Sequence, residues 1–277
     1  MVQAMIVDTH VHVISDDQRK YPRRANPPEW VTDTSGEMLL SLNREAGIDK
    51  TVLVQGYGPY EYDNGYAVDC ARALPDRFTS VVIVDQRRPD ASERLNYWVK
   101  ERGARGLRLA TTTEPETLLD DPQTFPVWQT ASSLGIPICI MTRFHQVGRL
   151  PTVLERFPDV PVALDHLGAP RLSDGPPYES LQSLFELARF TNVYLKFSTE
   201  TCYAARRGKS NSREFFDRVL DRFGANRLMW GSNFPATHDR PLKEQLALAR
   251  EDLSFVPAEQ QRWLFGETAL SLWPELR

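Results

Sequence analysis

Ile6-Val7-Asp8-Thr9-His10-Val11-His12 is a short apolar run that ends in two histidines spaced two residues apart. In a β-strand, residues two apart point to the same face, so both imidazoles would project together from the strand's C-terminal end. Imidazole is a common metal ligand and a proton donor or acceptor near neutral pH. Since the whole chain has only five histidines, this pair predicts a strand that carries chemistry. The alternative is a chance pair that bonds only to backbone.

Similar short runs recur along the rest of the chain. Each is rich in Val, Ile or Leu and is bounded by Gly, Pro, Asp or Asn, which is typical of buried strands. The eight expected strands are Met5–Thr9, Thr51–Val54, Thr79–Val84, Gly106–Leu109, Ile136–Met141, Val160–Asp165, Val193–Phe197 and Arg227–Gly231.

The segments between these runs are expected to be helices. Ser35 would cap Gly36–Ala46, which Gly47 would end. The other expected helices are Asn64–Ala73, one from Asp90 or Ser92 to Arg102, Pro122–Leu134, Val147–Phe157, Tyr178–Ala188, Ser212–Phe223 and Pro241–Asp252, with Ala258–Leu272 as an extra C-terminal helix.

Eight strands alternating with eight helices predict an α/β protein with a parallel sheet. At this length the closed (β/α)8 TIM barrel is the natural arrangement, and we expect residues 1–277 to form one such domain. The alternative is an open doubly wound sheet. If it bound nucleotides, that fold would show a glycine-rich first turn, and no such turn follows the first run.

Composition excludes several classes of function. The net charge is −4 and no cluster of Lys and Arg recurs along a face, so nucleic acid is a poor partner. No apolar stretch approaches the roughly 20 residues that cross a bilayer, and no secretion signal is evident. The three cysteines are far apart, which favours reduced thiols in a cytoplasmic protein.

Polar side chains follow most of the expected strands at their C-terminal ends, where barrels of this kind carry their chemistry. This concentration favours an enzyme over a structural barrel. In strand order the residues are His10 and His12, Gln55 and Tyr57, Arg108, Thr142 and Arg143 with His145 beyond, Asp165 and His166, Lys196 with Ser198 and Glu200 after it, and Ser232 and Asn233 with His238 beyond.

Five of these segments, taken in order, resemble the amidohydrolase superfamily and its amidohydrolase-related (amidohydrolase 2) branch. They are Asp8-Thr9-His10-Val11-His12, Arg105-Gly106-Leu107-Arg108, Asp165-His166-Leu167-Gly168, Tyr194-Leu195-Lys196-Phe197-Ser198 and Trp230-Gly231-Ser232-Asn233-Phe234-Pro235. The branch includes 2-pyrone-4,6-dicarboxylate lactonase, sulfomuconolactone hydrolase, sugar-lactone hydrolases and a semialdehyde decarboxylase. The resemblance covers essentially the whole chain.

The resemblance implies a set of catalytic and metal-binding residues. His10, His12 and His166 would hold one divalent metal ion, zinc or similar, which would activate water. Asn233 stands where the family commonly has an aspartate that serves as metal ligand and base. Since an amide is not basic, the alternative is a site without a cofactor, in which the three histidines act on water directly. His166 is then the leading candidate for the general base, and Lys196 would polarise a carbonyl or pair with Glu200 or another internal acid.

Two arginines point to the substrate class. Arg108 and Arg143 would offer guanidinium groups matched to a carboxylate, although a salt bridge within a loop is an alternative for Arg143. Tyr57 and Asn64 lie on loops at the same end and would contact the substrate. The predicted partner is therefore a small carboxylated molecule.

The segment Ser15–Thr34 follows the first strand and is longer than an ordinary connection between a strand and the next helix. We expect it to fold over the site as a lid and to contribute Tyr21 or Trp30. The apolar C-terminal helix would pack on the barrel or on a neighbouring copy, as in a homo-oligomer.

These observations lead to one main hypothesis, a cytoplasmic hydrolase that opens a carboxylated lactone with activated water. The alternatives are a metal-dependent non-oxidative decarboxylase on the same barrel, a binder that has lost its chemistry, and a hydrolase of amides or imides.

Overall fold

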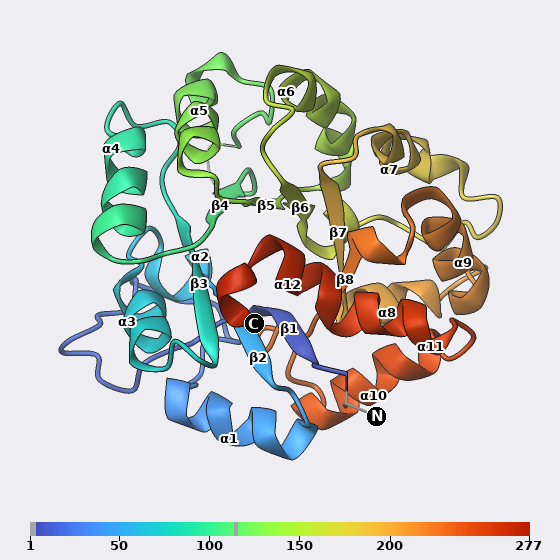
Figure 1. The fold of residues 1–277 in the computed structure, drawn as a ribbon, viewed down its shortest axis with the longest axis horizontal. Coiled ribbons are helices and arrows are strands. Elements are labelled where there is room, and N and C mark those ends of the chain that lie inside the picture. The colour runs from blue at the N-terminus through green and yellow to red at the C-terminus, as the bar shows by residue number, and fades with distance from the viewer. Residues whose placement is uncertain (1–3, 114–115) are drawn as a thin grey trace.

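The protein forms a barrel of eight parallel strands surrounded by helices (Figure 1). The structure is a computed structural model that describes residues 4–113 and 116–277. The strands follow one another around the barrel in chain order, which confirms the predicted (β/α)8 architecture. They are β1 Val7–Val11, β2 Lys50–Val54, β3 Phe78–Ile83, β4 Leu107–Ala110, β5 Ile138–Met141, β6 Val162–Leu164, β7 Val193–Ser198 and β8 Leu228–Gly231.

The first and last strands meet and close the barrel. Val11 pairs in parallel with Phe234, just beyond β8. The backbone N–H of His12 donates to Phe234 O at 2.8 Å, and that of Asn233 donates to His10 O at 2.8 Å. Because of this closure, the two histidines of β1 lie beside the segment that follows β8.

Helices cover the outside of the barrel. Ser35 accepts a hydrogen bond from Met38 N, and Gly47 ends the first helix with a left-handed φ of 73°, both as predicted. The helices are α1 Gly36–Ala46, α2 Tyr57–Tyr60, α3 Gly65–Ala73, α4 Ala91–Asn96, α5 Phe125–Leu134, α6 Leu150–Arg156, α7 Gln182–Glu186, α8 Thr199–Ala205, α9 Ser212–Phe223, α10 Leu242–Asp252, α11 Ala258–Arg262 and α12 Thr268–Leu272.

Two departures from the predicted elements affect the site. β1 begins and ends two residues later than predicted, so His10 lies within the strand rather than after it. A short helix that the sequence did not indicate, α8, follows β7 without a connecting loop. Seven residues are too few to display a helical apolar period, which is why the pattern missed it.

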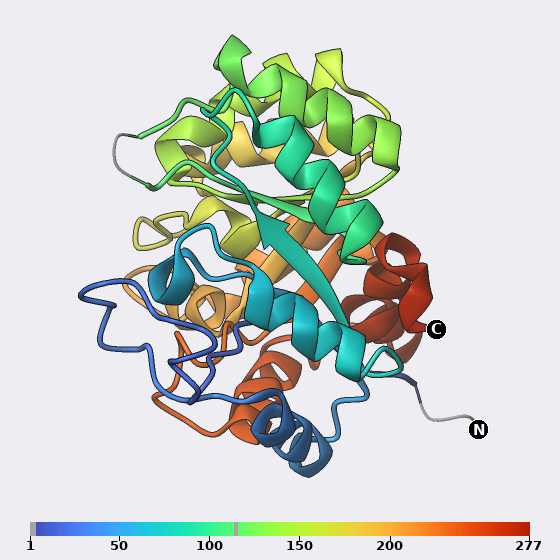
Figure 2. The same ribbon diagram turned by 90° about the vertical axis from the view of Figure 1, so that its left-hand side faces the viewer.

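The C-terminal segment closes one end of the barrel. Trp273 and Leu276 pack with Ala269 against the inward-facing side chains Val7 and Val81. In Figure 2 the C-terminal segment, drawn in red, lies at one end of the barrel, and the segment Ser15–Thr34, in dark blue, lies at the other. The predicted C-terminal helix therefore packs on the barrel itself, and the opposite end remains for the site. In the described part of the chain, no helix has the length and apolarity that crossing a bilayer requires.

Candidate active site

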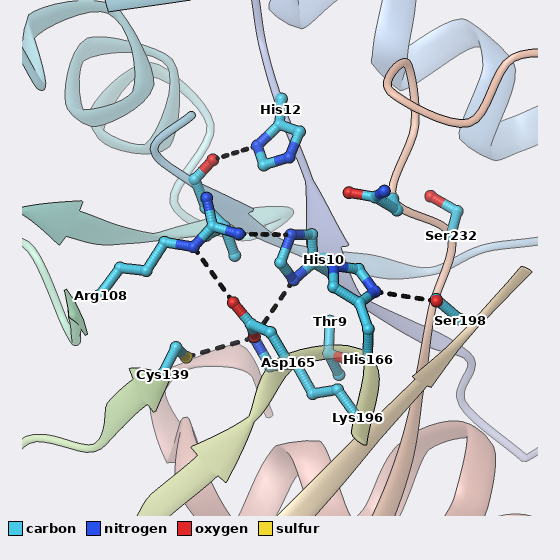
Figure 3. Close-up of polar contacts among 12 residues, drawn as sticks. Thr9, His10, His12, Arg108, Cys139, Asp165, His166, Lys196, Ser198 and Ser232 are labelled. Atoms are coloured by element: carbon cyan, nitrogen blue, oxygen red, sulfur yellow. Dashed lines mark hydrogen bonds and ion pairs between the residues drawn. The ribbon is translucent and has the colours of Figure 1, made fainter. Parts of the chain in front are cut away.

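A buried carboxylate organises the C-terminal end of the barrel (Figure 3). Asp165, which directly follows β6, lies 3.3 Å from His10 Nδ1, 3.1 Å from Arg108 Nε and 3.2 Å from Lys196 Nζ. All four side chains, here called the Asp165 cluster, are buried. Burial alone would raise the pKa of Asp165, but Lys196, His10 and Arg108 outweigh it and hold that pKa well below its ordinary value. The cluster thus contains a permanent anion between two permanent cations.

Lys196 belongs to this cluster and not to Glu200. The sequence left open whether Lys196 pairs with Glu200 or with another internal acid. In the structure its ammonium group pairs with Asp165. Lys196 Nζ also donates to Cys139 Sγ at 3.2 Å. Burial would lower the pKa of Lys196, but Asp165 raises it above the ordinary value, so the ammonium group stays charged.

His10 has both ring nitrogens engaged by the cluster. Arg108 Nη2 lies 3.3 Å from His10 Nε2. Since a guanidinium only donates, Nε2 must accept, and the proton of the neutral ring lies on Nδ1, facing Asp165. Burial, only partly opposed by Asp165, lowers the pKa of His10 well below its ordinary value.

His12 shares the face of His10, as the spacing predicted, and their ring centroids are 5.0 Å apart. His12 Nδ1 donates to the carbonyl oxygen of Val54 at 2.7 Å, so Nε2 carries a lone pair. Burial, followed by the charge of Arg108, lowers the pKa of His12 to about 3. The ring of Trp30 lies 5.5 Å from that of His12.

The predicted lid is therefore in contact with the site through Trp30. A bridge between Ile14 and Thr34 joins the two ends of the segment. Tyr21, the other predicted contributor, instead donates its hydroxyl to Asp69. Whether the segment acts as a lid stays a prediction.

His166 contacts both Ser198 and His10. Its Nδ1 is 2.8 Å from Ser198 Oγ, and its ring centroid is 4.7 Å from that of His10. Burial lowers the pKa of His166, although Asp165 and Glu200 oppose that shift. The backbone of His166 and Leu167 is left-handed, with φ of 53° and 55°, and such residues cost of order 1 kcal/mol each. This strained turn, forced by the surrounding barrel, aims the imidazole at the cavity.

A cavity of about 270 Å³ lies beside His166. His166, Glu200 and Asn233 supply its polar lining, and the rest is largely apolar. Asn233 Nδ2 donates to Glu200 Oε1 at 2.8 Å. Glu200 lies in the first turn of α8. Its position two residues beyond Ser198 placed it at the expected catalytic end of the barrel, but only as a possible partner of Lys196, because the helix that carries it was not predicted.

The four predicted substrate-binding residues lie apart from this cavity's lining. Arg108 is held by Asp165 and also donates to Gln55 O. Arg143 is exposed at the end of β5. Tyr57 is half-buried against Tyr62, and the amide of Asn64 is occupied by the backbone of residues 62 and 83. Their contact with a substrate stays a prediction.

The donor set does not fit a divalent cation. A metal at the first-strand pair would need the lone pair of His10 Nε2, which already accepts from Arg108, and it would lie beside that guanidinium. At the eighth strand the ligand is the neutral amide of Asn233, whose Nδ2 faces Glu200. Within residues 4–113 and 116–277, no three side chains of His, Cys, Asp or Glu are grouped to hold a metal ion.

Asp8 ties β1 to β8 beneath the histidines. Its Oδ1 accepts from the backbone N–H of Ser232 at 2.9 Å and of His10 at 3.1 Å. Burial raises the pKa of Asp8 to about 6, although these bonds lower it. The carboxyl group of Asp8 therefore loses its proton near pH 6 in the folded protein and near pH 4 in the unfolded chain.

We expect Asp8→Asn to flatten the pH dependence of stability in that range. The folded protein holds the Asp8 proton more tightly than the unfolded chain, so in the wild type this group's contribution to stability is present below pH 4 and is lost as pH rises towards 6. A shift of about 2 units corresponds to about 3 kcal/mol. Urea unfolding of both proteins at intervals from pH 4 to 7 measures it, and parallel curves for the two proteins would contradict the expectation.

Sequence comparison relates the chain to a known family and to hydrolases of lactones. The family model described as Amidohydrolase matches residues 7–274. An L-fucono-1,5-lactonase of Burkholderia ambifaria is 26% identical over 209 residues, which are 74% of this chain and 71% of that protein. A 4-sulfomuconolactone hydrolase of Rhizobium radiobacter is 24% identical over 234 residues, which are 82% of this chain and 75% of that protein.

Solved structures share the fold over nearly the full length. A probable 2-pyrone-4,6-dicarboxylic acid hydrolase of Acinetobacter baumannii, with citric acid bound, has a TM-score of 0.78 at 19% identity and covers 97% of this chain and 99% of its own. A dihydroxybenzoic acid decarboxylase of Polaromonas sp. JS666, with manganese bound, has a TM-score of 0.70 at 15% identity over 99% and 98% of the two chains. At these identities the structures establish the barrel alone.

Proposed function

The chain belongs to the amidohydrolase family, and on that premise we propose that it is a hydrolase that opens a carboxylated lactone by adding water at the acyl carbon. The observation that carries the proposal is the cavity where His166, Glu200 and Asn233 meet at the catalytic end of the barrel. The names of the two similar lactone hydrolases support a cyclic ester as substrate.

His166 is the residue that we place against the reacting atoms. Ser198 occupies its Nδ1, so Nε2 is the nitrogen left for a water or a carbonyl oxygen. Because burial lowers the pKa of His166, the ring is neutral near pH 7. In that state Nε2 serves as a general base through its lone pair, or as a donor to the carbonyl oxygen in the other tautomer.

The neighbouring groups hold this arrangement. The Asp165 cluster orients His10, whose ring packs against His166, and His12 stays neutral beside it with a free Nε2 lone pair. We propose that Lys196 and Arg108 act through this cluster as positioning residues. Asn233 contributes hydrogen bonds, since its amide accepts no proton from water.

A carboxylated substrate is supported by the names and contents of similar proteins and by one arginine. The similar barrel with citric acid bound is a probable 2-pyrone-4,6-dicarboxylic acid hydrolase. In this chain Arg108 is engaged by Asp165, so we propose that the substrate's carboxylate meets Arg143, exposed at the same end of the barrel.

A panel of carboxylated and sugar-derived lactones tests the proposed function. We expect at least one to be converted to a ring-opened hydroxy acid whose mass exceeds the lactone by one water. Release of CO₂ from hydroxybenzoates, with no lactone opened, would replace the proposal with decarboxylation. Binding without any turnover would indicate a protein that has lost its chemistry.

Removal of divalent cations is expected to leave this activity unchanged. The reason is that His10 Nε2 is engaged by Arg108 and the eighth strand offers an amide rather than a carboxylate. Protein purified without added metal should be assayed before and after dialysis against a chelator, with its metal content measured in parallel. A loss of activity that returns with stoichiometric zinc or manganese would contradict this expectation.

A further inference from the structure

The carboxylate of Glu200 lines the cavity beside His166. Oε1 of Glu200 accepts hydrogen bonds from Asn233 Nδ2 and from the hydroxyl of Thr237. These two donors, both from the segment after β8, hold the carboxylate in one orientation. Glu200 is therefore a fixed group of the site rather than a mobile surface side chain.

The second oxygen of this carboxylate is free. Oε2 of Glu200 is buried and has no hydrogen-bond partner among the described residues. An unpaired charged oxygen in a buried position costs free energy unless something in the cavity bonds to it. Because His166 lines the same cavity, a water or substrate there can contact both groups.

Asn233 explains why the carboxylate is needed at this place. An amide on the eighth strand cannot take a proton, yet its N–H group points at Glu200 and orients a residue that can. The two residues thus divide between them what a single aspartate on β8 would supply.

We propose that Glu200 is the general base of this hydrolase and that His166 is the hydrogen-bond donor to the acyl oxygen. This proposal rests on the proposed lactone hydrolysis. Oε2 takes one proton from water as the water oxygen bonds to the acyl carbon, while His166 Nε2–H stabilises the negative charge on the former carbonyl oxygen. When the bond from the acyl carbon to the ring oxygen breaks, that oxygen takes the proton from Glu200. The product is a hydroxy acid, and the carboxylate is restored.

The surroundings of His166 agree with this division of roles. With the proton on Nε2, Nδ1 accepts from the hydroxyl of Ser198, which lies 2.8 Å away. Burial lowers the pKa of His166, and the negative charges of Asp165 and then Glu200 oppose that shift. His166 and Glu200 line the same cavity.

The first test replaces the carboxylate by the isosteric amide. We expect Glu200→Gln to lower kcat/KM for the lactone by at least about 10²-fold. The matched control is Glu244→Gln, an exposed glutamate on α10, which should behave as wild type. Wild-type kcat/KM in Glu200→Gln would overturn the proposal.

The second test moves the carboxylate across the hydrogen bond. The exchange variant Glu200→Gln/Asn233→Asp should recover at least about tenfold over Glu200→Gln, because it returns a carboxylate to the cavity beside His166. An exchange variant no more active than Glu200→Gln, while equally stable to heat, would overturn the proposal.

A binding measurement separates this proposal from the proposed function. A cyclic phosphonate analogue of the lactone is anionic, so the carboxylate of Glu200 should repel it, and Glu200→Gln should bind it more tightly than wild type at the same pH, by about tenfold. If wild type opens no lactone, the proposed function fails; if wild type and Glu200→Gln bind the phosphonate equally, the assignment of Glu200 fails.

Discussion

His166→Ala is expected to lower kcat/KM for lactone opening by at least about 10³-fold. The variant loses the Nε2 group next to the reacting atoms, and a preorganised donor or base of this kind supplies a factor of 10² to 10⁴. The methyl side chain of alanine has no polar atom, so it cannot replace the lost contact. Steady-state kinetics on the best lactone of the panel measures the effect.

The control for this variant is His145→Ala. His145 is largely exposed and lies 3.1 Å from Glu116, away from the cavity lining. Its loss should leave kcat/KM within about twofold of wild type. Full turnover in His166→Ala would remove His166 from the chemistry, whatever the state of Glu200.

Asp165→Asn is expected to lower the free energy of unfolding by about 3–5 kcal/mol. The substitution leaves Arg108 and Lys196 buried without their anion, and breaking a buried pair from one side has this cost. Urea unfolding at pH 7 measures the change. Adding Lys196→Met should recover part of the loss, because it removes one of the two stranded cations.

The control is a surface pair of the same chemistry. Glu155 and Arg189 are 2.9 Å apart, but each side chain is 62% exposed. Glu155→Gln should change the free energy of unfolding by less than about 1 kcal/mol. A similarly small effect of Asp165→Asn would mean that the Asp165 cluster does not stabilise the barrel.

The fold could be predicted because its signal is local. A strand buried on both faces must be apolar along its length, so each of the eight runs is visible without knowledge of its neighbours. All eight strands occur, with ends that differ by a few residues. α8 was missed because its seven residues, directly after β7, contain no readable period, so Glu200 was considered only as a possible partner of Lys196.

The histidines of the site could be identified for a similar reason. His10, His12 and His166 stand in short motifs at strand ends, so their presence on one end of the barrel follows from strand direction alone. The spacing of His10 and His12 also placed both rings on one face, as found.

Which groups these residues touch was decided by tertiary structure. Arg108 and Asp165 are 57 positions apart, and Arg108 and His10 are 98 apart. No pattern within one strand indicates that Lys196 pairs with Asp165 rather than with Glu200. Nor does any such pattern indicate that Asn233 donates a hydrogen bond to Glu200.

The sequence by itself determined the barrel, the end of it that carries the chemistry and the histidines found there, because these depend on apolar periodicity and strand direction. The tertiary structure alone decided which carboxylate is neutralised within the Asp165 cluster and which has an oxygen free in the cavity. Charge and hydrogen bonding act through distances of about 3 Å, and only closure of the barrel sets those distances.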